Sequence, residues 1–418
     1  MKNKTLILVL AYIFIICGLL TACKNPSGSG STNSIQNDTV IFEANGGYPV
    51  PNNQIVNLGD MIYVPKAMTK TGYGFCGWYK EPACTNQWNF ATDTVNQNIT
   101  LYAKWESPII VSGTSFNDKK TWLGNFAQSN NYYLIELTTN QSIDPTTFSY
   151  SGKNNITIEL KGIGSNPIII NLNTDGSMFT IETDVSLILN NLELKGRPNN
   201  PFSLIMINSG GNLTINQGTK IIDNIFNSNT NGNLLTSING GGVYNAGTFT
   251  MHNGEISGNN ITNSPINYPS QLYVWGGGVY NSGTFFMTGG KICNNKVTSF
   301  SFFEASGGGV HSSGTFIISG GEIAGNSISS DGALGGGVYI GGGFKKKGGT
   351  IFGYTFGNSN SNIVKDYFGN IVQQCGHAVY VNHSYDHRMF TDTTSGPGDN
   401  LAFDASVNPP VWSGLWDN

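Results

Sequence analysis

The sequence predicts an all-β protein whose larger part is a right-handed parallel β-helix solenoid. The first observation is a Gly-rich unit that occurs four times, beginning with Gly-Gly-Gly-Val at Gly240, Gly276, Gly307 and Gly335. The second is that apolar residues inside each unit stand two positions apart, which is the spacing of one face of a strand. Units that recur about every 28 to 36 residues indicate stacked repeats. Right-handedness follows from the strong preference of connections between parallel strands.

Aligning the four units brings like residues into columns. The aligned columns are Val243, Val279, Val310 and Val338; Phe249, Phe285, Phe316 and Phe344; and Ile256, Ile292, Ile323 and Ile351. Gly pairs separate the columns and allow positive φ at sharp corners, whereas the Gly density and the lack of a 3.6-residue period exclude helical repeats. Each unit is therefore predicted to hold three short strands around a dry centre, about 4.8 Å from the next coil.

Two polar ladders are predicted along the solenoid. Four asparagines close an Ile-x-x-Asn pattern in consecutive units, at Asn224, Asn259, Asn295 and Asn326. An amide at a repeated corner can bond the backbone of the next coil, so we assign these residues a structural role. The residue before each isoleucine alternates in charge, at Lys220, Glu255, Lys291 and Glu322. Because an exposed pair is worth roughly a few tenths of a kcal/mol, a solvated face is favoured over a binding stripe.

The N-terminus has the pattern of an exported lipoprotein. A basic start precedes an apolar run of about 15 residues, which suits a signal peptide better than a membrane span. The run ends in Leu-Thr-Ala-Cys at residues 20–23, which resembles a bacterial lipobox and implies cleavage and lipidation at Cys23. An ordinary secretory signal is the alternative. Residues 1–22 are predicted to be the signal peptide, and the Ser/Gly/Asn-rich residues 23–37 a flexible tether between lipid and protein.

Composition limits the classes of function. Gly occurs 55 times and charged residues make up only 11% of the 418 residues, which suits a turn-rich solenoid. The formal net charge is −4, so the chain lacks the basic footprint that nucleic-acid binding needs.

Residues 38–106 are predicted to be a small separate module. Strand-like runs at Val40–Glu43 and Ile99–Lys104 bracket Gly-rich turns, and Trp78, Trp88 and Trp105 supply much of a core. The segment resembles the Listeria–Bacteroides repeat, the B-repeat of internalin-type surface proteins. The matching residues are Phe42, Gly46-Gly47, Gly59-Asp60, Pro65, Gly72-Tyr73, Phe75, Gly77-Trp78-Tyr79, Trp88 and Leu101–Trp105. The resemblance implies a β-grasp-like module that serves as a spacer or interaction unit on a bacterial surface protein.

Two cysteines lie close together in this module, at Cys76 and Cys84. In an exported protein their proximity favours a disulfide, although a Cys pair is not part of the B-repeat motif. Cys293 follows the inward Ile292 and is predicted to be a small residue on a strand.

Residues 107–150 are predicted to cap the solenoid. The stretch from Asn117 offers an N-cap and a short amphipathic helix with Trp122, Leu123 and Phe126 on one face. Laid over the first coil, this helix would shield an open sheet edge. Residues 151–418 are predicted to form the β-helix and its C-terminal cap. Its early coils show as apolar runs at 156–160, 167–172, 178–181 and 185–192.

The arrangement as a whole resembles known surface proteins. The Gly-Gly-Gly-Val and Ile-x-x-Asn units are similar to the repeats of chlamydial polymorphic outer-membrane proteins. The combination of lipobox, B-repeat and solenoid is similar to β-helical surface lipoproteins of treponemes, which are spirochaetes. This resemblance implies a lipid-anchored adhesin or antigenic scaffold at the cell surface or outer membrane. Its expected partners are the membrane, through the lipid, and a host matrix protein or glycan.

Catalysis is the main alternative, because parallel β-helices also host polysaccharide lyases and hydrolases. Such sites need two or three carboxylates that project together from neighbouring coils. Asp223 stands alone in its aligned column, and Glu255 and Glu322 are separated by the coil that holds Lys291. We therefore predict a protein without catalysis and keep a carbohydrate-active enzyme as the alternative.

Two clusters of basic residues are candidate binding sites. His383 and His387 have the spacing of a Zn²⁺ site on a helix, but nothing there predicts a helix, so loop histidines are favoured and we expect no metal or other cofactor. The run from Lys345 to Lys347 could bind an acidic glycan or a lipid headgroup, although a gatekeeper near the end of the solenoid is favoured. Lys346 falls in an inward column, which implies a loosened or wet coil.

Aromatic residues in the inserts between units form the predicted binding surface. Phe286 and Ile317 are predicted to face outward from their strands. The predicted binding residues are Tyr268, Tyr273, Trp275, Phe300, Phe302 and Phe303. Variable inserts on one face of a solenoid often form its binding surface, whereas packing of the inserts against the rod is the alternative.

Overall fold

The computed structural model describes residues 37–227, 237–263, 273–299, 305–372 and 375–382, and the short strands at 388–390, 401–404 and 411–413. The regular elements of the described residues are strands, apart from a single α-helix of 11 residues, so the predicted all-β class is confirmed. No helix in this part of the chain is long and apolar enough to cross a bilayer.

The N-terminal module is a small mixed sheet. Its strands are β1 (Asn37–Glu43), β2 (Gln54–Asn57), β3 (Gly74–Tyr79) and β4 (Ile99–Glu106), in the order β2-β1-β4-β3. The central pair β1–β4 is parallel, and the two outer pairs are antiparallel. Phe42, Trp78, Trp88 and Leu101 lie in one buried core, and Trp105 packs against it. The aromatic residues that define the module in the sequence therefore also hold it together.

A helix covers the first coil of the solenoid. After β5 (Ile109–Ile110), helix α2 (Phe116–Phe126) begins at an N-cap, Ser115, whose side chain accepts a hydrogen bond from the Asp118 amide. Its buried residues are Phe116, Lys119 and Leu123. Phe126, predicted to belong to the inner face, is instead 56% exposed, because it lies on the outer side, where its ring packs at a tilt against the half-buried Trp122.

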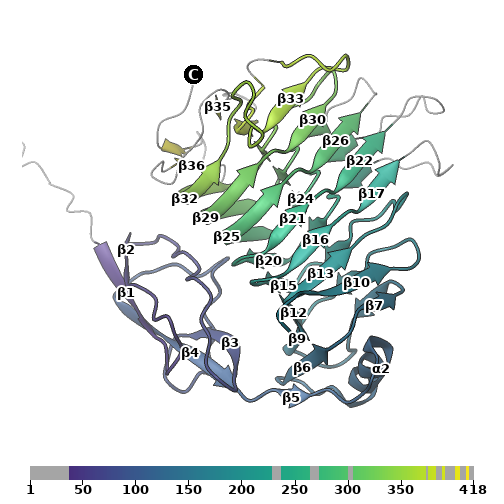
Figure 1. Cartoon of the computed structure of the whole chain (residues 1–418). Helices are drawn as coiled ribbons and strands as arrows, with labels where there is room; N and C mark the ends of the chain where they lie inside the picture. Colours follow the sequence, from purple (N-terminus) through teal and green to yellow (C-terminus); the bar gives the residue numbers. More distant parts are fainter. Residues whose placement is uncertain are drawn as a thin grey trace, which may run out of the picture.

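Three walls of parallel strands form the solenoid (Figure 1). The first wall consists of β6 (Tyr132–Leu137), β9 (Ile156–Gly162), β12 (Val185–Asn190), β15 (Asn212–Ile215), β20 (Thr248–Met251) and the first parts of β25 (Thr284–Cys293), β29 (Thr315–Ala324) and β32 (Phe344–Ile351). The second wall consists of β7 (Gln141–Ile143), β10 (Ile168–Leu172), β13 (Leu192–Lys195), β16 (Lys220–Ile222), β21 (Glu255–Ser257) and the last parts of the same three long strands. The third wall consists of β8 (Thr146–Phe148), β11 (Phe179–Ile181), β14 (Ile205–Ile207), β19 (Val243–Asn245), β24 (Val279–Asn281), β28 (Val310–Ser312), β31 (Val338–Ile340) and β34 (Val379–Val381). These parallel walls confirm the predicted β-helix.

The register is the one that the aligned units predict. Val243 pairs with Val279, and Ile256 pairs with Ile292. The rings of Phe249 and Phe285 stack with centroids 4.6 Å apart and an interplanar angle of 5°. These column residues are fully buried in one continuous core. Lys346 occupies its predicted inward position and is also fully buried.

The described parts of the inserts form a lateral lobe on the rod, which agrees with the alternative that the inserts pack against it, although the strands of this lobe were not predicted. Its strands are β17 (Ile225–Asn227), β22 (Asn260–Asn263), β26 (Lys296–Ser299), β30 (Ser327–Ser329) and β33 (Ile363–Lys365), with β18 (Ser237–Asn239), β23 (Tyr273–Trp275) and β27 (Ala305–Ser306) in a smaller sheet. The two sheets enclose a second core that includes Ile261, Val274 and Val297. The described parts of the inserts therefore build ordered structure onto the rod.

Antiparallel strands end two of the walls. β35 (Arg388–Phe390) pairs with β34, and β36 (Leu401–Asp404) pairs with β32 and with β37 (Val411–Ser413). These pairings cover strand edges that would otherwise offer unpaired backbone groups.

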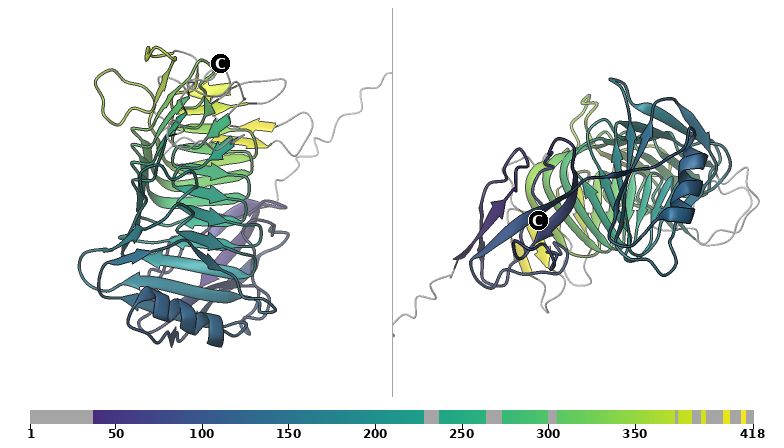
Figure 2. Two further views of the ribbon diagram at one scale, coloured as in Figure 1. Left: turned by 90° about the vertical axis from the view of Figure 1, so that its right-hand side faces the viewer. Right: turned by 90° about the horizontal axis from the view of Figure 1, so that it is seen from below.

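The N-terminal module folds back along the first wall, as the views in Figures 1 and 2 show. Near β6, a Cβ atom on Gly74 would lie 2.2 Å from the Tyr132 ring, so only glycine allows this approach. Near β32, the amines of Lys345 and Lys347 lie over the ring of Tyr63. The module therefore contacts the wall close to both of its ends.

This placement changes the predicted exposure of two residues on the first wall. Phe286 and Ile317 were expected to present their side chains to solvent, but they are only 2% and 5% exposed. Phe286 lines the space between the wall and the module, and Ile317 pairs in register with Lys345, over which Tyr63 lies. The strand faces are as predicted, but the module covers them.

Candidate functional site

Most of the predicted binding residues lie outside the described part of the chain. These are Tyr268, Phe300, Phe302 and Phe303, together with the lipidation residue Cys23 and the histidines His383 and His387. Tyr273 and Trp275 are described, on strand β23.

A column of aromatic rings follows the outer face of the third wall. Its members occupy the same position in five successive strands and are Tyr244, Tyr280, His311, Tyr339 and Tyr380. Neighbouring rings stack with centroids 4.8 to 6.0 Å apart. The column arises because each unit places a ring directly after its inward valine, so the coil spacing brings the rings into contact.

The predicted residues Tyr273 and Trp275 lie beside this column. The Trp275 ring stacks on Tyr280 at 5.9 Å and on His311 at 5.4 Å, and Tyr273 lies 5.4 Å from Trp275. Tyr244, Tyr273, Trp275 and Tyr280 are all half-buried. We call these four residues the aromatic patch. The structure thus joins two predicted residues to two tyrosines that the sequence analysis left out, although both follow a Gly-Gly-Gly-Val motif.

Burial keeps the ring column uncharged. His311 is buried, and burial lowers its pKa to about 3. Its Nδ1 atom lies 2.8 Å from the Ser306 hydroxyl oxygen. The imidazole is therefore neutral at ordinary pH, and the column presents ring faces and edges rather than charge.

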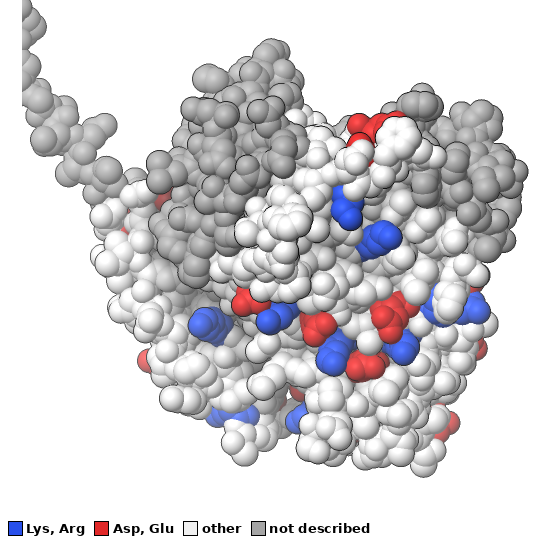
Figure 3. All heavy atoms as spheres, turned by 45° about the horizontal axis from the view of Figure 1, so that its top comes forward, with Lys and Arg blue, Asp and Glu red and all other residues white. Residues whose placement is uncertain are grey.

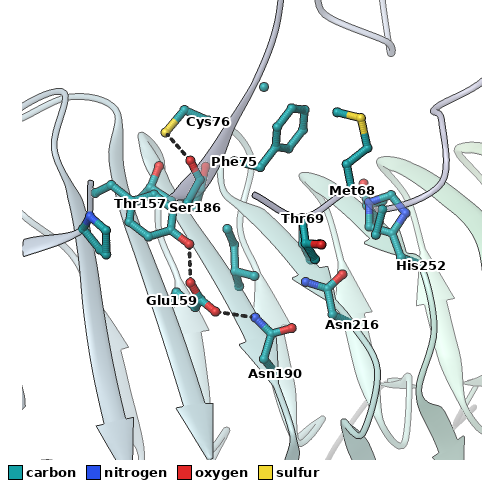
Figure 4. A pocket seen from close by; sticks show the side chains of 18 of the residues that line it. Met68, Thr69, Phe75, Cys76, Thr157, Glu159, Ser186, Asn190, Asn216 and His252 are labelled. Atoms are coloured by element: carbon teal, nitrogen blue, oxygen red, sulfur yellow. Dashed lines mark hydrogen bonds between the residues drawn. The ribbon is translucent and has the colours of Figure 1, made fainter. Parts of the chain in front are cut away.

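A second candidate site is the cleft between the module and the first wall (Figure 4). It has a volume of about 1870 Å³. Met68, Thr69 and Phe75 of the module lie across from Asn190 and Asn216 of the solenoid (Figure 4). The sequence could not predict this cleft, because the cleft depends on how the module and the solenoid, which are separate segments of the chain, pack against each other.

The titratable groups in the cleft are held in definite states. The Tyr132 hydroxyl donates a short hydrogen bond to Glu159, and Asn190 Nδ2 donates to the other oxygen of the same carboxylate at 2.7 Å. Burial, with the Glu159 charge, raises the pKa of Tyr132. Burial also lowers the pKa of His252 to about 4 and raises the pKa of Cys76 to about 12. The histidine is thus neutral and the thiol is protonated near pH 7.

The predicted disulfide between Cys76 and Cys84 is not formed, since both are free cysteines. Each sulfur instead faces the carbonyl oxygen two residues before it, at 3.6 Å, on Gly74 and Pro82. Cys76 lines the cleft, whereas Cys84 sits at positive φ in a turn outside the strand. The two cysteines are close in sequence, but their side chains do not point toward each other, as a disulfide would require.

The asparagine ladder runs along a buried corner of the solenoid. Asn224, Asn259, Asn295 and Asn326 are at most 2% exposed. In each of three steps, the side-chain oxygen of one Asn accepts a hydrogen bond from the backbone amide of the Asn one coil earlier, at 3.1 to 3.2 Å. The ladder continues to Asn362 after Asn326 and to Asn200 before Asn224. Its role is structural, because every amide is already used within the protein.

The charge ladder on the second wall has the predicted alternation. Glu255 pairs in register with Lys220 and Lys291, and Lys291 pairs with Glu322. The Lys291 amine lies 2.9 Å from the Glu322 carboxylate, with both side chains well exposed. Figure 3 shows acidic and basic side chains interspersed on this face of the molecule, so it has no large area of one sign.

Among the described residues, no three His, Cys, Asp or Glu side chains gather closely enough to hold a metal ion. In the cleft, Glu159 is bound by Tyr132 and Asn190, and Glu106 forms an ion pair with Lys104 at 2.6 Å. These carboxylates therefore have structural partners.

Comparison with known proteins identifies the N-terminal module. Residues 39–104 match the Listeria-Bacteroides repeat domain. Over 68 residues, or 16% of this chain, the sequence is 46% identical to a protein of Evansella cellulosilytica that carries the name of a Gly-rich membrane protein, and 43% identical to a second protein of that organism named as a membrane protein. Over the same length it is 37% identical to Internalin H of Listeria monocytogenes. The matched segment spans 8%, 10% and 12% of these three relatives, so the likeness concerns the module alone.

Proposed function

We propose that this protein is a lipid-anchored bacterial surface protein that binds a host matrix protein or a surface glycan, as an adhesin does. Three observations support the location: a lipobox ending at Cys23, a module of the Listeria-Bacteroides type, and relatives named as membrane proteins and as an internalin. The resemblance of the whole arrangement to treponeme lipoproteins and chlamydial repeat proteins agrees with the same role, with the outer membrane as the site of anchoring.

The aromatic patch is the observation on which the binding role rests. Tyr and Trp combine a large apolar surface with a polar tip, and they dominate the binding energy of many interfaces. Here two such rings of the third wall meet two of the lateral lobe, on a different wall from the one that the module covers. Binding rather than catalysis is favoured, because the cleft carboxylates Glu106 and Glu159 are already paired.

The test uses the full chain in detergent on arrays of glycans and host matrix proteins. Trp275→Ala is expected to weaken binding of the captured ligand by tenfold or more, because a central aromatic anchor is worth about 2 kcal/mol or more. Phe368→Ala removes an aromatic residue that is 83% exposed outside the patch and is the matched control. Equal loss in both variants would contradict the role of the patch. Release of reducing ends from a polysaccharide panel would favour the alternative, a carbohydrate-active enzyme.

The anchor is tested separately with Cys23→Ser. The variant is expected to leave the membrane fraction and to lose labelling by palmitate, since the acylated sulfur is gone. Palmitate that persists in the variant would show that Cys23 is not the lipidated residue.

A further inference from the structure

We propose that the cleft between the module and the first wall is a second binding site, for a linear neutral oligosaccharide that lies along the solenoid axis. This site is separate from the aromatic patch, which lies on the third wall and the lateral lobe beside it. The cleft proposal therefore goes beyond the adhesin role, and it can be wrong while the adhesin role still holds.

The solenoid side of the cleft repeats small uncharged polar groups from coil to coil. Thr157, Ser186, Asn212 and Thr248 are joined in one register column on four neighbouring strands. Thr214 and Thr250 are paired in the next column. All six residues line the cleft and are half-buried. Coils are ~4.8 Å apart, which is close to the length that one pyranose unit adds to a linear chain, so successive sugars would meet the same kind of group.

These polar groups are free to serve a ligand. In the described part of the chain, the hydroxyls of Thr157, Ser186, Thr214 and Thr250 neither donate nor accept a hydrogen bond, although dozens of other side chains do. Half-buried hydroxyls without a protein partner are available to hydrogen-bond the hydroxyls of a ligand.

The module supplies the opposite side. Phe75, which is half-buried, and Met68 stand across the cleft from Asn190 and Asn216 (Figure 4). An aromatic ring opposite rows of hydroxyls and amides suits a sugar, which has apolar C–H faces and a polar rim. A ligand held by both sides would also fasten the module to the solenoid.

Charge and backbone geometry favour a neutral sugar chain over other linear ligands. The cleft is lined by four lysines and three carboxylates, and one of the lysines is paired with Glu106, so the lining has an excess of only one positive charge and is poorly matched to a polyanion. His252 adds no charge, because burial lowers its pKa to about 4. An extended peptide binds best at an open strand edge, and the solenoid side of the cleft offers none, since it is the face of a sheet whose strands are paired on both sides. The module side includes the edge strand β3, so a peptide is the competing ligand, and the rows of hydroxyls on the solenoid side favour a neutral chain of sugars.

The test is calorimetric titration of the full chain in detergent with four neutral hexasaccharides, cellohexaose, xylohexaose, laminarihexaose and N-acetylchitohexaose, and with hexagalacturonate as the acidic counterpart. At least one neutral chain is expected to bind more tightly than hexagalacturonate. The double variant Ser186→Ala/Thr214→Val is expected to weaken that binding at least fivefold, with an unchanged melting temperature. Thr180→Val is the matched control, since Thr180 holds a similar outward position on β11 of the third wall.

The outcomes separate this site from the aromatic patch. Loss of hexasaccharide binding in the cleft double variant, but not in Thr180→Val or Trp275→Ala, supports the cleft. Binding that only Trp275→Ala abolishes would move the site to the patch and overturn the inference while leaving the adhesin role intact. Failure of all four neutral chains to bind, or tighter binding of hexagalacturonate, also overturns it.

Discussion

The side-chain nitrogen of Lys347 lies 4.5 Å from the centre of the Tyr63 ring. This contact joins the N-terminal module to the last long strand of the first wall, and Lys345 approaches the same ring to 5.4 Å. Burial and the neighbouring Lys345 lower the pKa of Lys347, as expected for an amine held in an interface. Lys345 and Lys347 thus have a partner in the module, which the sequence alone did not indicate.

Replacement of Lys347 is expected to loosen the module. Lys347→Met keeps the aliphatic length of the side chain and removes the cation, so the lost interaction with Tyr63 is worth roughly 1 to 2 kcal/mol at a partly desolvated site. Hydrogen exchange of residues 60–70 should become faster, while the Asn ladder stays protected. Lys296→Met, at an exposed lysine of the lateral lobe, should leave both regions unchanged. Unaltered exchange in Lys347→Met would mean that other contacts hold the module.

Removal of one rung from the asparagine ladder is expected to cost far more than removal of a surface amide. Asn295 donates to the Ile256 carbonyl at 2.9 Å and to Asn326, and its oxygen accepts from Asn259. Asn295→Ala leaves buried donors and acceptors unpaired, at about 1 to 3 kcal/mol for each group. Asn260→Ala, next to the ladder and half-buried, is the control and should change stability by less than about 1 kcal/mol. Thermal unfolding decides, and similar melting temperatures would contradict the structural role of the ladder.

The repeat made the solenoid predictable from the sequence, but it did not predict the lateral lobe or the module that pack on the solenoid. Val243, Ile256 and Asn259 were assigned correctly because each recurs at a fixed place in every unit, so one error would have been visible in four copies. Asn362 could not be assigned to the ladder from the sequence, because it lies 11 positions after Ile351, whereas the Asn of each earlier unit lies three positions after its Ile. The strands of the lateral lobe are only two to four residues long, too short for a period-two pattern to stand out.

The two candidate sites also differ in whether the sequence could predict them. The ring column could have been found, because Tyr244, Tyr280, His311 and Tyr339 each follow the valine of a Gly-Gly-Gly-Val motif. The cleft could not, since it depends on Gly74 packing against Tyr132 and on Tyr63 reaching Lys347. Neither contact belongs to a repeat or to the shared motif of the module.

Acid is expected to weaken the fold through its buried histidines. Burial lowers the pKa of His252 to about 4 and of His311 to about 3, against roughly 6.5 in an unfolded chain. The unfolded chain therefore binds protons that the folded chain does not. This effect leaves the free energy of unfolding unchanged above about pH 6.5. As the pH drops toward 4 and then 3, it lowers the free energy of unfolding by up to about 1.4 kcal/mol per pH unit for each histidine.

The variant His311→Phe tests this dependence, because phenylalanine keeps the ring stack and cannot be protonated. Its unfolding free energy should fall less steeply between pH 6.5 and 4 than that of the unmodified protein. Tyr280→Phe alters the same ring column without a titrating group in this range and should keep the original slope. Carboxylates such as Asp118, whose pKa its hydrogen bonds lower to about 2, act mainly below pH 4 and do not confuse the comparison.

The last prediction tests the inward and outward assignment on which both candidate sites depend. Ile292 is fully buried between Ile256 and Ile323, whereas the adjacent Lys291 faces outward and pairs with Glu322 at 2.9 Å. Ile292→Asp buries a carboxylate without a partner and is expected to cost several kcal/mol, enough to unfold the neighbouring coils.

Lys291→Asp instead stacks three acidic side chains on an exposed face. Since water and salt screen such charges, it should cost only about 1 kcal/mol, and less at high ionic strength. Thermal melts of the two variants at low and high salt give the comparison. Equal destabilisation, or a larger effect at Lys291, would mean that the inward and outward faces of the second wall are assigned the wrong way round. The outward columns of the other walls, and with them the cleft floor and the aromatic patch, rest on the same alternation within each coil and would have to be assigned again.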